Sequence, residues 1–97
     1  MGFFQNLFGK VNRDELKEML DKGALLIDVR TRDEFNAGHA AKAINIPLQM
    51  LGQSVNKLKG KNVITVCKSG TRSAMAVTML KKDGINAFNG GAWNNWQ

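Results

Sequence analysis

A chain of 97 residues with 43% hydrophobic and 23% charged residues has the composition of one ordinary folded domain, which excludes a disordered or low-complexity protein. The 14 Lys and Arg residues outnumber the 8 Asp and Glu residues, giving a formal net charge of +6, but they are scattered and no basic stripe with interleaved aromatic residues occurs. This distribution argues against nucleic-acid binding and favours a mild preference for small anionic ligands. The single cysteine cannot form an internal disulfide, which fits a reducing, cytoplasmic compartment.

The chain begins with an apolar segment, residues 1–10, ahead of the domain that we expect over residues 11–97. Four large apolar residues recur in the segment at helical spacing: Phe3, Phe4, Leu7 and Phe8. No basic region precedes them and no small-residue cleavage site follows, and the segment is shorter than the ~20 apolar residues that span a bilayer. We expect one or two helical turns that pack on the domain, with membrane docking or a partner groove as the alternative.

Helix and strand signals alternate along the rest of the chain. Asn12 with Glu15, and Thr31 with Glu34, have the spacing of capping boxes and predict two helices that end near Gly23 and Gly38. Further helices are predicted over residues 49–58 and 72–82, and short apolar strands over residues 24–29, 43–46, 62–66 and 85–88. This alternation predicts an α/β fold with a parallel sheet and helices on both faces, joined by right-handed crossovers.

The cysteine, Cys67, directly follows the strand predicted over residues 62–66. In folds with parallel sheets, ligands bind outside the carboxyl ends of the strands, so Cys67 stands where this architecture places its chemistry. The small residues Ser69, Gly70 and Thr71 allow successive backbone N–H groups to turn inward and form an anion-binding nest.

Charge around the same loop favours the thiolate of Cys67 over its thiol. Lys68 and Arg72 contribute two formal positive charges, and the helix predicted over residues 72–82 presents the positive end of its dipole. Together these effects can bring the pKa of a cysteine from about 8.5 into the range of about 3.5–7.5. The alternative is a buried, inert cysteine that packs as a small hydrophobe. That alternative does not explain the two cations and the polar, glycine-bearing loop.

Three stretches of the chain resemble single-domain rhodaneses, which are sulfurtransferases. They are "LIDVRTRDEFNAGHAAKAINIP", "VCKSGTRSAMAVTML" and "FNGGAWNNW", in the order and spacing of that family. The resemblance covers nearly the whole chain from Asn12 onward. It implies a rhodanese-like fold with a five-stranded parallel sheet, one strand more than the apolar runs predict, and it implies a short additional strand near residues 10–12.

The resemblance also implies that Cys67 carries sulfur as a persulfide, which it takes from a donor such as thiosulfate and passes to cyanide or a thiol. The loop residues would bind the substrate: Lys68, Ser69, Gly70, Thr71, Arg72 and Ser73. Lys68 and Arg72 would orient the anionic donor, and Asp28 and Arg30 would support the loop from behind. The sequence contains no second cysteine, so the persulfide must wait for an outside acceptor, either a small molecule or a protein. Neither a cofactor nor a metal is implied.

Three alternatives to a sulfurtransferase remain open. Phosphatases and arsenate reductases also carry a cysteine loop that ends in arginine, but four residues separate Cys67 from Arg72, whereas the related phosphatases have five. The shorter loop suits a single sulfur atom better than a tetrahedral oxyanion. The alternatives from outside that enzyme class are a non-catalytic rhodanese-like module, acting as a persulfide carrier or in regulation, and a redox sensor without a resolving cysteine.

Several other residues receive structural interpretations. Arg30 and Glu34, four apart at a helix start, are expected to pair with each other. His39, the single histidine, is expected to form a structural hydrogen bond, and one His with one distant Cys does not make a metal site. Met75 and Met79 lie one helical turn apart and are expected in the core. The two tryptophans, Trp93 and Trp96, are expected to cover the sheet edge or the mouth of the site.

Overall fold

The computed structural model describes residues 11–97, so the apolar segment 1–10 and the helical turns expected in it lie outside the described residues. The strands are β1 (Leu25–Asp28), β2 (Ala43–Asn45), β3 (Asn62–Cys67) and β4 (Asn86–Ala92). The α-helices are α2 (Arg13–Asp21), α3 (Arg32–Ala37), α4 (Val55–Leu58) and α5 (Thr71–Lys82), and two 3₁₀ helices are η1 (Leu48–Ser54) and η2 (Trp93–Trp96). Among the described helices, none is long and apolar enough to cross a membrane.

The four strands form one sheet in the order β2-β1-β3-β4, and every pairing is parallel. This confirms the α/β fold with a parallel sheet. The additional strand near residues 10–12 is not part of the described sheet: Val11 and Asn12 precede α2 without strand structure, and Lys10 lies outside the described residues. The sheet places the carboxyl ends of β1 and β3 side by side, because Asp28 pairs in register with Val66.

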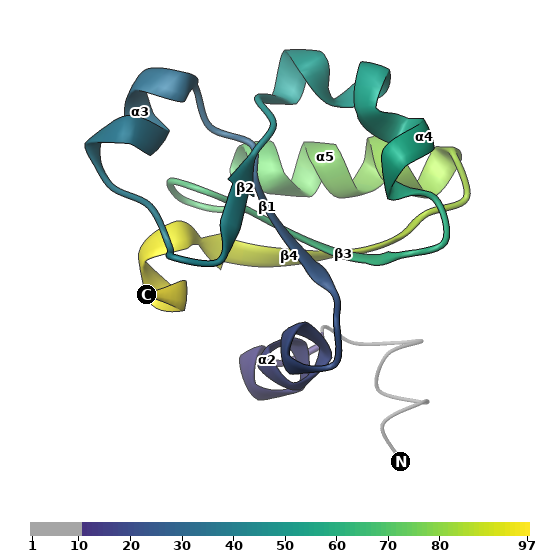
Figure 1. Ribbon diagram of the computed structural model, residues 1–97, viewed down its shortest axis with the longest axis horizontal. Coiled ribbons are helices and arrows are strands. Elements are labelled where there is room, and N and C mark those ends of the chain that lie inside the picture. Colours follow the sequence, from purple (N-terminus) through teal and green to yellow (C-terminus); the bar gives the residue numbers. More distant parts are fainter. Residues whose placement is uncertain (1–10) are drawn as a thin grey trace.

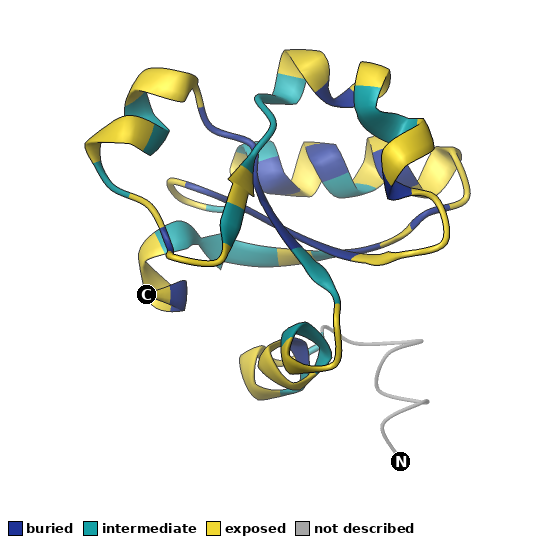
Figure 2. Cartoon of the chain, in the orientation of Figure 1, coloured by how far each residue is buried: buried dark blue, intermediate teal, exposed yellow. Residues whose placement is uncertain are grey.

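Two apolar layers hold the sheet between helices (Figures 1 and 2). Alternate residues of each strand point to opposite faces. Ile27 and Val63 belong to the cluster under α4 and α5, and Leu26 and Ile64 belong to the cluster that Leu16 of α2 completes on the other face. The central strands β1 and β3 are therefore buried on both sides, as their continuous apolar sequences predict.

Both capping boxes form as predicted. Asn12 and Glu15 exchange backbone and side-chain hydrogen bonds at the start of α2, and Thr31 and Glu34 do so at the start of α3. The helix predicted over residues 49–58 is instead the 3₁₀ helix η1 followed by the short helix α4. Gly52 lies inside η1, and a glycine disfavours regular α-helix.

Strand β4 is longer than predicted and contains a β-bulge. Thr65 pairs with Asn89 but Cys67 pairs with Ala92, so β4 has one extra residue between these pairs. Gly91 takes a φ of +78° there, a backbone conformation that favours glycine. The two glycines of "NGG" therefore bend the strand rather than end it.

The two methionines of α5 are not core residues, contrary to the prediction. Met75 is 52% exposed and Met79 is 38% exposed, whereas Ala76 and Leu80 of the same helix are buried. The spacing of Met75 and Met79 is correct for one helix face, but the sheet contacts the face one residue further along.

Trp96 is buried against the α2 side of the sheet, and its indole N–H donates to the carbonyl of Gly90 at 2.9 Å.

Replacing Gly90 with alanine is expected to lower the free energy of unfolding by about 1–3 kcal/mol. A Cβ at this position would lie 2.9 Å from methyl carbons of Ile64 and Val66 and 3.1 Å from the carbonyl oxygen of Thr65, so β4 would have to move away from β3. Gly52→Ala is the matched control, because its Cβ would meet nothing within 4 Å. Urea denaturation measures both, and equal stability of the two variants would contradict the close approach of β4 to β3.

Candidate active site

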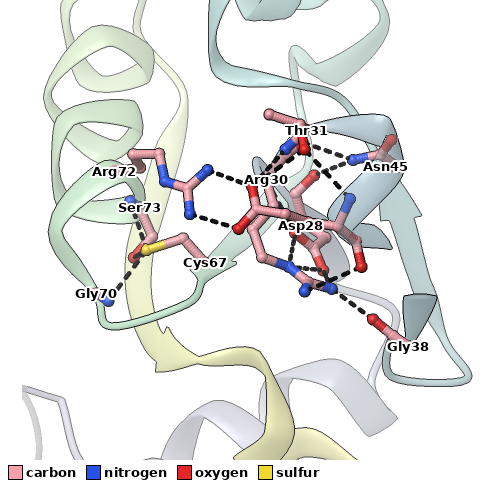
Figure 3. Close-up of polar contacts among 10 residues, drawn as sticks. Asp28, Arg30, Thr31, Gly38, Asn45, Cys67, Gly70, Arg72 and Ser73 are labelled. Carbon is pink, nitrogen blue, oxygen red and sulfur yellow. Dashed lines mark hydrogen bonds and ion pairs between the residues drawn. The ribbon is translucent and has the colours of Figure 1, made fainter. Parts of the chain in front are cut away.

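Cys67 is the last residue of β3, and the chain passes from it through a three-residue turn into α5 (Figure 3). Gly70 has a φ of +98° and immediately precedes α5, so a side chain there would be strained. The hydroxyl of Thr65 donates to the carbonyl of Ser73 at 2.9 Å, which ties the first turn of α5 to β3. The turn is therefore held by β3 at its start and by the bond between Thr65 and Ser73 at its end.

The sulfur of Cys67 accepts two backbone hydrogen bonds from this turn. The N–H of Gly70 lies 3.0 Å from Sγ and the N–H of Ser73 lies 3.3 Å from it. The hydroxyl oxygen of Ser73 lies 3.4 Å from Sγ, and Cys67 as a whole is only 1% exposed. The loop thus surrounds the sulfur with backbone donors, which is the arrangement of an anion-binding nest.

Opposing influences act on the thiol of Cys67. Burial raises its pKa. The N–H groups of Ser73, Ser69 and Gly70 lower it, and so does the hydroxyl of Ser73 whenever that hydroxyl donates to the sulfur. The hydrogen bonds outweigh burial, so the pKa of Cys67 lies below its ordinary value. The thiolate of Cys67 therefore forms at a lower pH than the thiolate of an ordinary cysteine.

Arg72 forms a two-pronged ion pair with Glu34 of α3. One terminal guanidinium nitrogen lies 2.7 Å from Oε1 and the other 3.0 Å from Oε2. Hydrogen bonding to Arg72 is the main reason that the pKa of Glu34 falls to about 2, and the same pair raises the pKa of Arg72. The predicted pairing of Arg30 with the Glu34 carboxylate is therefore wrong: Arg30 donates to the backbone carbonyl of Glu34, at 3.3 Å.

Because the pKa of Glu34 is lowered in the folded protein, its contribution to stability is present above the unfolded value of 4.5 and is lost as pH falls toward about 2. Glu34→Gln is expected to unfold with a weaker pH dependence than the native chain between these values. Urea denaturation at several pH values tests this. Because the pair is one-third exposed, only a modest difference is expected, and parallel pH profiles would contradict it.

Asp28 and Arg30, at the carboxyl end of β1, form a second and more deeply buried pair. The Arg30 Nε lies 2.9 Å from Oδ1 and a terminal nitrogen lies 2.7 Å from Oδ2. The same terminal nitrogen donates to the carbonyl of Gly38 at 2.7 Å, and the Trp93 ring lies 4.5 Å from the guanidinium carbon. This network positions the segment that leads into α3, and hence Glu34.

The remaining predicted residues occupy distinct places in the loop. Lys68, Ser69 and Thr71 are exposed, while Ser73 is buried beside the sulfur. His39 has its predicted structural role, since its Nδ1 lies 2.8 Å from the carbonyl oxygen of Phe35.

The sequence did not indicate Asn89 of β4 as a site residue. Its side chain contacts Ser73, Gly70 and Gly91. Only the three-dimensional pairing of β4 with β3 brings it to the loop, so no local pattern reveals it. An open cavity of about 960 Å³ is lined by residues 69–71 of this loop and by parts of α2, α5 and β4, and Cys67 does not line it.

A parallel sheet whose central strand ends in a cysteine held by backbone N–H groups defines an α/β domain with an anion-binding loop at its carboxyl edge. A family profile described as "Rhodanese-like domain" matches residues 12–97. The chain therefore belongs to the rhodanese-like family, as the sequence resemblance predicted.

Individual relatives agree with this assignment. Thiosulfate sulfurtransferase 18 of Arabidopsis thaliana is 33% identical over 104 residues, an alignment that covers 89% of this chain and 76% of the relative. A tRNA sulfurtransferase of Thermoplasma acidophilum is 35% identical over 74 residues, which cover 75% of this chain but 15% of that protein. Uncharacterized protein YqhL of Bacillus subtilis is 44% identical over 62 residues, 63% of this chain and 49% of its own length. The chain thus spans less than half the length of these last two relatives.

Solved structures show the same fold. The human single-domain sulfurtransferase TSTD1 is 30% identical, with a TM-score of 0.77 over 90% of this chain and 93% of that one. Protein SSP1007 of Staphylococcus saprophyticus is 29% identical, with a TM-score of 0.75 over 91% of this chain and 92% of that one. The similarity therefore extends over nearly the full length of both single-domain structures.

Proposed function

We propose that the protein is a sulfurtransferase that moves a sulfane sulfur from a donor such as thiosulfate to a thiophilic acceptor through a persulfide on Cys67. The observation that carries this proposal is the sulfur of Cys67 held by the N–H groups of Gly70 and Ser73 at the carboxyl end of β3. Membership of the rhodanese-like family supports it. Small thiols, cyanide or a protein thiol would serve as acceptors.

The reaction proceeds in two half-reactions. The Cys67 thiolate attacks the outer sulfur of thiosulfate, a new S–S bond forms, and sulfite leaves with the electrons of the broken S–S bond. A thiolate or cyanide then attacks the terminal sulfur of the persulfide. The persulfide S–S bond breaks, and its electrons regenerate the Cys67 thiolate. This is covalent catalysis, for which ping-pong kinetics are expected.

The loop would stabilise the charge on the terminal sulfur of the persulfide. The N–H groups of Gly70 and Ser73 point at the sulfur, and fixed donors of this kind stabilise a developing negative charge without reorganising. Arg72 has no free terminal nitrogen to offer the donor, since each already donates to an oxygen of Glu34, which also neutralises its charge. Exposed Lys68 is then the better placed cation to orient an incoming donor.

The length of the loop favours this reaction over phosphatase or arsenate reductase chemistry. Four residues separate Cys67 from Arg72, and the two backbone N–H contacts converge on the cysteine sulfur itself. We place the chemistry in the cytoplasm, where acceptor thiols are kept reduced.

Mass spectrometry after incubation with thiosulfate tests the proposal. We expect the peptide that contains Cys67 to gain one sulfur atom, sulfite to be released in equal amount, and cyanide or a thiol to remove the added sulfur. Protein alkylated at Cys67 beforehand is the control and should gain nothing. Failure to gain sulfur from thiosulfate, polysulfide or a protein persulfide would overturn the proposal, and gain without release to any acceptor would indicate a carrier module.

A further inference from the structure

The hydroxyl of Ser73 has two neighbours that compete for it. Its oxygen lies 3.4 Å from the sulfur of Cys67 and 2.6 Å from Oδ1 of Asn89. A serine hydroxyl carries one proton, so at any moment it donates to one neighbour. Which neighbour receives this proton decides whether Ser73 stabilises a thiolate.

The orientation of the Asn89 amide is fixed by two backbone groups. Its Nδ2 donates to the carbonyl of Gly70 at 3.0 Å, and its Oδ1 accepts from the N–H of Gly91 at 2.9 Å. A carbonyl can only accept and a backbone N–H can only donate, so turning the amide over would break both bonds. The atom that faces Ser73 is therefore an acceptor, and the proton of Ser73 lies between Oγ and Oδ1.

With its proton directed to Asn89, Ser73 presents a lone pair to Cys67. A thiol can donate its S–H to that lone pair, whereas a thiolate cannot accept anything from it. We propose that Asn89 is a positioning residue that withholds the Ser73 hydroxyl from the thiolate of Cys67 and so opposes its ionisation. The thiolate gains the hydroxyl bond only by breaking the bond between Ser73 and Asn89.

The persulfide is affected differently from the thiolate. Once Cys67 carries a second sulfur atom, Sγ is bonded to two atoms and the negative charge resides on the terminal sulfur. The bond between Ser73 and Asn89 is compatible with that state. This part of the inference rests on the proposed sulfur transfer: Asn89 makes the free thiolate less stable relative to the persulfide, and so favours loading of sulfur.

The charged groups around the sulfur are either paired with each other or exposed, so they are separate from the hydrogen bond between Ser73 and Asn89. Arg72 of α5 is paired with Glu34 of α3, and Asp28 and Arg30 of β1 are paired with each other. Lys68 in the turn is exposed, and β4, which supplies Asn89, contains no titratable side chain. Replacing Asn89 by an uncharged residue therefore changes hydrogen bonding at the sulfur without changing the formal charge of the site.

The pH dependence of alkylation by iodoacetamide measures the pKa of Cys67, which is the sole cysteine. Asn89→Ala is expected to lower that pKa by about one unit, because the freed hydroxyl then donates to the thiolate. In the Ser73→Ala background the same substitution is expected to leave the pKa unchanged. Asn89→Asp keeps the acceptor for Ser73 and is expected to show no decrease.

An equal shift in the native and Ser73→Ala backgrounds would show that Asn89 acts by holding Gly70, and would overturn the inference. A rise of the pKa in Asn89→Ala would overturn it as well. Alkylation requires no sulfur donor, so this experiment can succeed even if sulfur transfer is not the function. The proportion of persulfide formed at a fixed thiosulfate concentration tests the second part, and a lower proportion in Asn89→Ala is expected.

Discussion

Asp28→Ala is expected to lower the free energy of unfolding by about 3–5 kcal/mol. The carboxylate of Asp28 is fully buried and receives three contacts from the Arg30 guanidinium, between 2.7 and 3.0 Å. Removing it leaves a cation that is itself 4% exposed without its counter-charge. Breaking a buried pair costs more than the pair contributes, because the remaining charge keeps its desolvation penalty.

Urea denaturation of the native chain, Asp28→Ala and Asp33→Ala measures this effect. Asp33 is an exposed aspartate in the first turn of α3, so its replacement is expected to cost less than about 1 kcal/mol. Replacing Asp28 and Arg30 together by apolar residues of similar size is expected to recover much of the loss. Equal stability of the two alanine variants would contradict the burial of the Asp28–Arg30 pair.

Cys67→Ser is expected to reduce sulfur transfer by at least about 1,000-fold, which is a conservative figure for removal of a covalent nucleophile. Serine is similar in shape and can accept the hydrogen bonds from Gly70 and Ser73, so the fold should persist. Its oxygen, however, cannot form the persulfide that links the two half-reactions. The variant therefore separates the chemistry from the architecture of the loop.

Release of sulfite or thiocyanate measures this effect, with the thermal unfolding midpoint as the control for folding. The expected result is lost turnover with a nearly unchanged midpoint. Turnover that survives in Cys67→Ser would exclude the persulfide mechanism, whereas an unfolded variant would be replaced by Cys67→Ala for the same test.

Local sequence signals predicted the features that depend on neighbours in the chain. Both capping boxes, and the positions of β1 and β3 to within one residue at each end, follow from residues within a few positions of one another. The wrong pairing of Arg30 has a local reason as well. The i,i+4 rule applies within a helix, but Arg30 precedes the N-cap Thr31, so its side chain lies outside the helical geometry and reaches Asp28 instead.

Features that depend on distant segments could not be predicted. Glu34 and Arg72 are 38 positions apart, and their pairing follows from the way α3 and α5 sit above neighbouring strand ends. Asn89 reaches Ser73 because β4 lies beside β3 with Asn89 opposite Thr65, and this depends on the register of two strands. The exposure of Met75 likewise depends on which face of α5 meets the sheet.

The ion pair between Arg72 and Glu34 also affects how substrates would be selected. This pair and the Asp28–Arg30 pair together neutralise four formal charges around the sulfur. Among the described loop residues, exposed Lys68 is the cation that belongs to neither pair. The two ion pairs therefore add little attraction for an anionic donor at the sulfur, and backbone dipoles act only at contact distance. On the proposed mechanism, Lys68 would be the charged group of the loop that favours anionic donors, and size and leaving group would decide among donors of equal charge.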